Sequence, residues 1–373
     1  MMLFLQTLSL AAFLYVALAM TPFTSIVAAD GLENLKPERL EAVRRSVATY
    51  RTQRTAIPQT GPFQEHRANL HVHSHWSHDS VGTVDEIVAA ARATGTSVLM
   101  FSEHPADHYD FYVDGNQGVT GVEIYNTHAD FKDEKNLVSA LKNPFRMIQM
   151  AELIQKYPQE CFAAIQNYPA DYLKRWDELT QIAPHTGVSA NDAHQNVGFV
   201  IRWTDGDKGR LEDALGEKGL EMDLSALPDI DALRKDKQPG DVIFSLFLDR
   251  YENSLRHVGT HLLLKDLSEQ SVRECLDAGR AFVAFDWIAD STGFDFVANS
   301  ETMRHEMGSQ VTLSPGLVLK AIAPLPVHWR LIRDGEVISE SDGSTLQSER
   351  RRLAHRVYVC SECGNGRAGC ARL

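Results

Sequence analysis

The sequence predicts an α/β fold whose parallel strands form a barrel, followed by a small β domain. Short apolar runs alternate with helical stretches from residue 67 onward, a pattern typical of parallel strands joined by crossover helices. From about Gly308 the helical patterns stop, and strand-like segments follow with a turn at Asp334-Gly335. The chain has 373 residues, 43% of them hydrophobic, which is enough for one large domain and a smaller one.

The N-terminal segment, residues 1–29, is expected to be a signal peptide that directs the protein to the periplasm or out of the cell. It carries no charged side chain, and Val27–Ala29 place small residues just before Asp30. An uncleaved membrane anchor is the alternative, because the apolar run Leu3–Met20 approaches the ~20 residues that cross a bilayer. No other segment is long and apolar enough to span a membrane.

Residues 30–66 are expected to form an N-terminal helix, from Leu32 to Arg51, and a turn-rich lead-in. Residues 67–300 are expected to form the barrel. Its first helix spans Thr83–Thr94, because Thr83 and Glu86 form a capping box and Gly95 provides a stop. A further helix is expected over 170–181. Strands are expected at 68–73, 97–102 (buried), 118–126, 185–191, 242–248, 260–264 and 281–287.

Two segments have no clear periodicity. The acidic insert 204–240 is expected to be loop-rich, either a lid or a solvated loop. Residues 301–350 are expected to form the small β domain, and the sequence does not decide whether that domain is complete. Residues 351–373 are expected to be an irregular tail. The tail holds Cys360, Cys363 and Cys370, too few ligands for a complete zinc site, so an altered C-terminus is favoured. The two other cysteines, Cys161 and Cys275, are expected to be buried or inert.

The net charge of -13 argues against nucleic acid as a general partner, because an acidic surface repels phosphate backbones. The favoured partner is a small-molecule or ester substrate. No membrane contact is expected beyond a retained N-terminal anchor.

Metal-ligand residues recur at the ends of the expected strands. His71 and His73 lie two apart at a strand end, so both imidazoles can reach one ion. Asp79 follows in the next loop, where His75 and His78 add ambiguity. The remaining candidates follow three later strands: Glu103 and His104, Glu123, and Asp192 and His194. Because barrel enzymes place their chemistry at the carboxyl ends of strands, these residues predict one metal centre, and imidazole with carboxylate suits Zn, Fe or Mn.

Four ordered motifs carry a family resemblance. They are NLHVHSHWSHDS (69–80), FSEHP (101–105), GVEIYN (121–126) and NDAHQNVG (191–198). Together they resemble the PHP (polymerase and histidinol phosphatase) domain, and within it the carbaryl-hydrolase-like metallohydrolases, over roughly residues 66–287. The resemblance implies a distorted (β/α)7 barrel of the PHP type that holds two or three divalent metal ions.

The resemblance also implies roles for these residues. His71, His73, Glu123 and Asp192 would hold one ion, with Glu123 bridging to a second. Asp79, His104 and His194 would hold a third, and Glu103 would orient a histidine ligand. A full three-metal centre of this family has two further histidine ligands between the last two motifs. The chain offers His128 and His185 there, and His128 is the better candidate. Two ions are therefore as plausible as three.

The expected reaction is hydrolysis, most simply of a phosphate ester (a phosphoesterase), by a metal-bound hydroxide near Glu123. His194 or His128 would assist as proton donor. Arg202, Arg250, Arg256 and His257 are weak candidates for substrate contacts, and solvated or structural roles are favoured for them. Because no basic cluster compels phosphate, hydrolysis of a carbamate, amide or carboxylic ester is the alternative. A non-catalytic exported binding module is the second alternative, which the chemically competent ligand set argues against.

Overall fold

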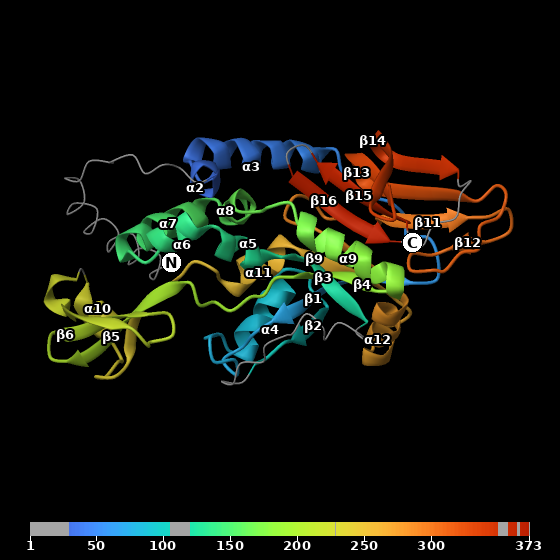
Figure 1. Ribbon diagram of the computed structural model, residues 1–373. Helices are drawn as coiled ribbons and strands as arrows, with labels where there is room; N and C mark the ends of the chain where they lie inside the picture. Colours follow the sequence, from blue (N-terminus) through green and yellow to red (C-terminus); the bar gives the residue numbers. More distant parts are fainter. Residues whose placement is uncertain (1–29, 105–119, 228, 350–356, 364–365, 373) are drawn as a thin grey trace.

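The computed structural model describes residues 30–104, 120–227, 229–349, 357–363 and 366–372, so the expected signal peptide lies outside the described residues. One mixed sheet runs from the N-terminal half of the chain to its C-terminal strands (Figure 1). Its strand order is β12-β11-β13-β15-β16-β10-β9-β1-β2, with β14 paired to β13. The bounds are β1 Gln64–Val72, β2 Val98–Phe101, β9 Gly259–Leu264, β10 Ala281–Ala284, β11 Asp295–Asn299, β12 Arg304–His305, β13 Val318–Arg333, β14 Glu336–Glu349, β15 Val357–Cys363 and β16 Gly366–Arg372.

The expectation of a closed parallel barrel is not met by the described strands. β1 and β2 are parallel, but β9 is antiparallel to β1 and β10 is antiparallel to β9. A separate parallel pair joins β3 (Gly121–Asn126) to β4 (Thr186–Ala190), and a single bridge between Val72 and Ala193 links β1 to the segment just after β4. Apolar periodicity identifies strands, whereas their direction depends on hydrogen-bond partners far away in the sequence.

The observed helices begin and end close to the capping residues and prolines in the sequence. α4 (Val84–Ala93) has the Thr83–Glu86 capping box, which confirms that prediction. The helix expected from Leu32 begins instead at Pro37, because proline suits a first helical turn, and a short α2 precedes it. The helix bounds are α2 Asp30–Asn34, α3 Pro37–Thr52, α5 Thr127–Asp133, α6 Lys135–Ala140, α7 Pro144–Lys156, α8 Pro158–Ala164, α9 Ala170–Ile182, α11 Tyr251–His257 and α12 Glu269–Ala278.

The acidic insert is not a loop. It contributes β6, β7 and the end of β5 to a second antiparallel sheet of order β7-β6-β5-β8, drawn in yellow-green at the lower left of Figure 1. The bounds are β5 Gly198–Asp205, β6 Lys208–Asp213, β7 Gly219–Asp223, β8 Val242–Phe247, a 3-10 turn Leu224–Ala226 and α10 Ile230–Arg234. Phe199, Ile201, Leu224 and Ile243 give this sheet its own buried cluster. The segment 242–248, expected in the barrel, therefore belongs to this sheet.

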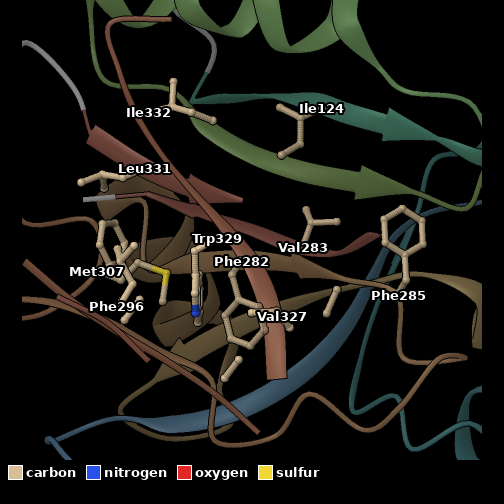
Figure 2. Packing of buried hydrophobic residues seen from close by; sticks show 14 of the residues in the cluster. Ile124, Phe282, Val283, Phe285, Phe296, Met307, Val327, Trp329, Leu331 and Ile332 are labelled. Atoms are coloured by element: carbon tan, nitrogen blue, oxygen red, sulfur yellow. The ribbon is translucent and has the colours of Figure 1, made fainter. Parts of the chain in front are cut away.

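The largest hydrophobic cluster joins the central strands to the C-terminal β region (Figure 2). Trp329 and Leu331 of β13 are fully buried among side chains that include Phe282 of β10 and Phe296 of β11. The expected turn is present, because Asp334 and Gly335 both have positive φ values (51° and 87°), as a type I′ hairpin requires.

Two other expectations fail. β2 was expected to be buried, but it is the last strand of the sheet, and Met100 and Phe101 are 49% and 36% exposed. The tail expected to be irregular contributes β15 and β16, which pair with each other and with β13 and β10.

Cys161 and Cys275 are buried free thiols, as expected. Within the described ranges, no helix has the length and apolarity needed to cross a bilayer.

A buried charged network lies where β1, β9 and the loop before β11 meet. The His261 ring nitrogens lie 2.7 Å from Glu65 Oε1 and 2.9 Å from Asp286 Oδ2. Arg67 Nε lies 2.8 Å from the same Asp286 oxygen, and Gly293 N–H donates to Glu65. Burial alone would lower the pKa of His261, but the two carboxylates outweigh it and raise that pKa to about 9. His261 is therefore a structural cation here.

Candidate metal centre

The ends of β1 and β4 are held together by backbone hydrogen bonds. His73 N–H donates to Ala193 O, and Asp192 N–H donates to His71 O, both at 3.0 Å. Asp192 has a φ of 51°, in the left-handed region that aspartate tolerates better than most residues. This arrangement brings two motifs that are about 120 residues apart in the chain to a single point.

Asp192 lies at the centre of the resulting cluster. Its Oδ1 lies 3.2 Å from His71 Nε2, 3.1 Å from His73 Nε2 and 3.5 Å from His194 Nδ1. Burial alone would raise the pKa of Asp192, but these imidazoles and that of His128 hold it well below its usual range. His194 Nδ1 lies closer to the Asp192 backbone carbonyl, at 2.8 Å. The Asp192 carboxylate and the His71 and His73 imidazoles form a group suited to a shared cation.

A second group of donors lies beside the first. His73, His104 and His194 have ring nitrogens within 4.8 Å of one another, and so do donor atoms of His78, Asp79 and His104. The Nδ1 atoms of His78 and His104 are 3.0 Å apart. The structure thus adds His78 to the candidate metal ligands. The sequence analysis had noted this residue but had assigned it no role.

Glu123 reaches the cluster from β3. Its Oε1 lies 2.5 Å from His71 Nδ1, so His71 lies between Glu123 and Asp192. Burial opposes protonation of His71, but the two carboxylates prevail and raise its pKa. Asn126, the last residue of the GVEIYN motif, donates from Nδ2 to Glu123 Oε2 at 3.0 Å and to Asp192 Oδ2 at 3.3 Å. Asn126 thus aligns both carboxylates, a role that the sequence did not reveal.

His128 lies on α5 against this cluster, with its ring 5.1 Å from that of His194. Burial lowers the pKa of His128 to about 4, and Lys132 and His194 add to this effect against the opposing charge of Asp192. His128 is therefore neutral near pH 7 and free to act as a ligand. Lys132 lies one helical turn further along α5 and is exposed, and its charge acts on His128; sequence analysis did not identify it.

Glu103 supports the first histidine loop. It accepts hydrogen bonds from Ser74 N–H, from the Ser74 hydroxyl and from the Ser77 hydroxyl. Burial would raise the pKa of Glu103, but these donors lower it. The Ser77 Oγ also lies 3.2 Å from His73 Nδ1, so the effect of Glu103 on a histidine passes through Ser77.

Two buried hydroxyls fix the backbone of the cluster. Tyr251 OH lies 2.8 Å from His73 O and 3.2 Å from His194 O. Ser80 Oγ lies 3.0 and 2.8 Å from the same two carbonyl oxygens. The two hydroxyls also lie 2.9 Å from each other. Because each hydroxyl has one proton, both carbonyls are satisfied only when each hydroxyl donates to a different one.

The remaining residues that the sequence offered as ligands or substrate contacts are not members of this cluster. His185 precedes β4, at the opposite end from Asp192, and its ring bonds to Ala183 O. Arg202 pairs with Glu212 in the second sheet, and Arg256 pairs with Glu252 on α11. Arg250 is exposed at the start of α11.

His257 is fully buried, and its ring is stacked on Trp287. Neither ring nitrogen has a hydrogen-bond partner among the described residues. Burial lowers its pKa to about 3, so its candidate role in substrate contact is not supported.

The donor set fits divalent ions. Imidazole and carboxylate donors from β1, β3, β4 and their loops converge, which suits Zn, Mn or Fe. Asp79 Oδ1 is buried and accepts no hydrogen bond from any described residue. The Nε2 atoms of His104 and His194 nevertheless lie 3.4 and 3.5 Å from it. Such an orphaned carboxylate oxygen among imidazoles calls for a cation.

Comparison with known families agrees with this centre. Residues 69–196 match the PHP domain. The chain contains a PHP domain. The match covers about a third of the chain and includes every predicted metal ligand. Neither the match nor the structure supports the carbaryl-hydrolase-like branch in particular.

Other comparisons add little. No curated protein matches the chain significantly. A solved structure from Bacteroides vulgatus, a two-domain protein containing a predicted PHP-like metal-dependent phosphoesterase, shares 11% identity with a TM-score of 0.24. That alignment covers 86% of this chain and 98% of the other, but at this TM-score it carries no argument about function.

Proposed function

We propose that the PHP domain of this chain is a metal-dependent hydrolase, and that it cleaves phosphate esters at a centre of two or three divalent ions. The convergence of His71 and His73 on Asp192 Oδ1, with His104 and His194 beside His73, is the main support, because it gathers donors from separate elements. When bound, such ions would lower the pKa of water and neutralise negative charge on the substrate.

The protein's own residues would divide the remaining work. Glu123 and Asp192, aligned by Asn126, would hold ligand positions fixed. His128 would serve as a ligand or hold a proton near the leaving group. Lys132 would supply the positive charge that phosphate recognition needs.

A carboxylic ester, carbamate or amide is the second candidate substrate class. Its support is that two of the three arginines first considered for phosphate, Arg202 and Arg256, pair with glutamates of their own elements in the described part of the chain. Lys132 on α5 is the cation whose charge acts on His128. The same ligand set can attack an acyl carbon, so a substrate panel must decide between the two.

Metal analysis and a substrate panel test the proposal together. Purified protein is assayed for Zn, Mn and Fe, then for hydrolysis of phosphomonoesters, phosphodiesters, carboxylic esters and carbamates with Mn or Zn added. We expect His71→Ala and Asp192→Ala to lose metal and hydrolysis while staying folded. His328→Ala removes a surface histidine paired with Asp342 and is the matched control. Wild-type metal content and activity in both site variants would contradict the assignment.

Export through residues 1–29 is a separate proposal that rests on the sequence pattern. Mass spectrometry of the secreted or periplasmic protein is expected to find Asp30 as the first residue. Retention of Met1 in that fraction would contradict cleavage.

A further inference from the structure

An apolar pocket lies beside the candidate metal centre, enclosed by helices α5 to α8. Its volume is about 660 Å³, with the space at its mouth included. His128, Asp192 and His194 line it, so the pocket and the metal centre share these side chains. Its other walls are largely hydrocarbon, including Phe131, Leu137, Leu141, Met150, Ile154 and Phe162, and the remaining polar members are Thr127, Asn191, Asp249 and Ser254.

The wall chemistry favours an apolar occupant. Ordered water needs several polar partners, and hydrocarbon walls offer few. Burial of alkyl or aryl surface against such walls is favourable at about 25 cal/mol per Å².

We propose that this pocket binds the apolar alkyl or aryl group of the substrate, while the scissile ester lies at His128, Asp192 and His194. This inference rests on the proposed hydrolase function and narrows its substrate class. For an alkyl phosphate, the oxygen of water bonds to phosphorus as the ester P–O bond breaks. The departing alkoxide takes a proton, so the products are an alcohol and phosphate.

The competing explanation is a packing defect. Several pocket residues, among them Leu137, Leu141 and Cys161, also belong to the hydrophobic cluster that joins α2 and α6 to α8. A defect inside that cluster would have no relation to catalysis. The three shared side chains of the metal centre distinguish the pocket from an ordinary void, and substrate length provides the test.

The first experiment compares methyl, butyl, hexyl and octyl phosphate with the metal-loaded protein. Each added methylene that enters the pocket is expected to raise kcat/KM about 3- to 4-fold until the pocket is filled. Calorimetry with methylphosphonate and hexylphosphonate, which have no ester bond to cleave, gives a binding readout apart from turnover. We expect hexylphosphonate to bind at least 10-fold more tightly.

The second experiment narrows the pocket. Ile154→Trp on α7 fills space in the wall, whereas Gln155→Trp places the same side chain on the exposed side of the same helix. We expect Ile154→Trp to lower the hexyl-to-methyl ratio of kcat/KM at least 10-fold and Gln155→Trp to leave that ratio unchanged. If Ile154→Trp fails to fold, Met150→Ala, which widens the same wall, is expected to shift the optimum to longer chains.

The outcomes separate the two proposals. Metal-dependent hydrolysis that is indifferent to chain length, with equal binding of both phosphonates, would overturn the pocket assignment and leave the hydrolase intact. Absence of any metal-dependent hydrolysis and of phosphonate binding would overturn the phosphoesterase proposal. A 4-nitrophenyl acetate, butyrate and hexanoate series then tests the pocket alone, because longer acyl chains should still be favoured.

Discussion

Removal of the Tyr251 hydroxyl should loosen the metal centre without touching any metal ligand. Tyr251 and Ser80 together supply two protons to the carbonyls of His73 and His194. In Tyr251→Phe, the Ser80 proton can satisfy only one of them. The other carbonyl keeps at best a long contact, since Val81 N–H lies 3.4 Å from His194 O.

The expected losses of stability and of metal affinity follow from this one missing hydrogen bond. Loss of one buried hydrogen bond costs about 1–2 kcal/mol of folding free energy. Groups that orient metal ligands typically contribute about 10- to 100-fold in metal affinity, and we expect the lower end because Ser80 still restrains the loops. Ser80→Ala combined with Tyr251→Phe removes both protons, so the double variant should approach the upper end.

Chelator competition with Zn or Mn measures the affinity, and urea unfolding measures the stability. Tyr157→Phe is the matched control, because its hydroxyl donates to Glu41 at 2.9 Å, on the α3 side of the molecule. Tyr251→Phe with wild-type metal affinity would refute the reasoning, as would an equal loss of affinity in Tyr157→Phe.

Three other predictions concern stability. His261 has a folded pKa of about 9 against an ordinary 6.5, so its contribution of roughly 3 kcal/mol is complete below pH 6.5 and is lost as pH rises through 9. Urea unfolding at pH 6 and 10 should show this loss in the wild type and not in His261→Gln. Leu331→Ala should cost about 2–5 kcal/mol because it opens a cavity in the core of Figure 2, whereas Val337→Ala, at an exposed site, should change the unfolding free energy by less than about 0.5 kcal/mol. Gly335→Ala forces a side chain into a turn position with φ of 87° and should lower the thermal midpoint, with a cost of about 1 kcal/mol. Equal midpoints for Gly335→Ala and the wild type would contradict the turn assignment.

The sequence alone predicted several local features and the ligand-type residues of the candidate centre. Capping at Thr83 and the Asp334-Gly335 turn depend on side chains within a few residues, so short-range patterns predict them. His71, His73 and Asp192 stood out because ligand-type residues at strand ends are spaced to share an ion.

Only the tertiary structure decided the direction of β9 and β10, the sheet that the acidic insert shares with β5 and β8, and the outer partners of the candidate metal centre. Strand direction and sheet membership depend on hydrogen bonds between segments far apart in the chain. Asn126, Lys132 and Tyr251 likewise carry no distinctive local pattern. The positions of Asn126 beside Asp192 and of Tyr251 beside His73 arise only when packing brings the end of β3 and the start of α11 against the ends of β1 and β4.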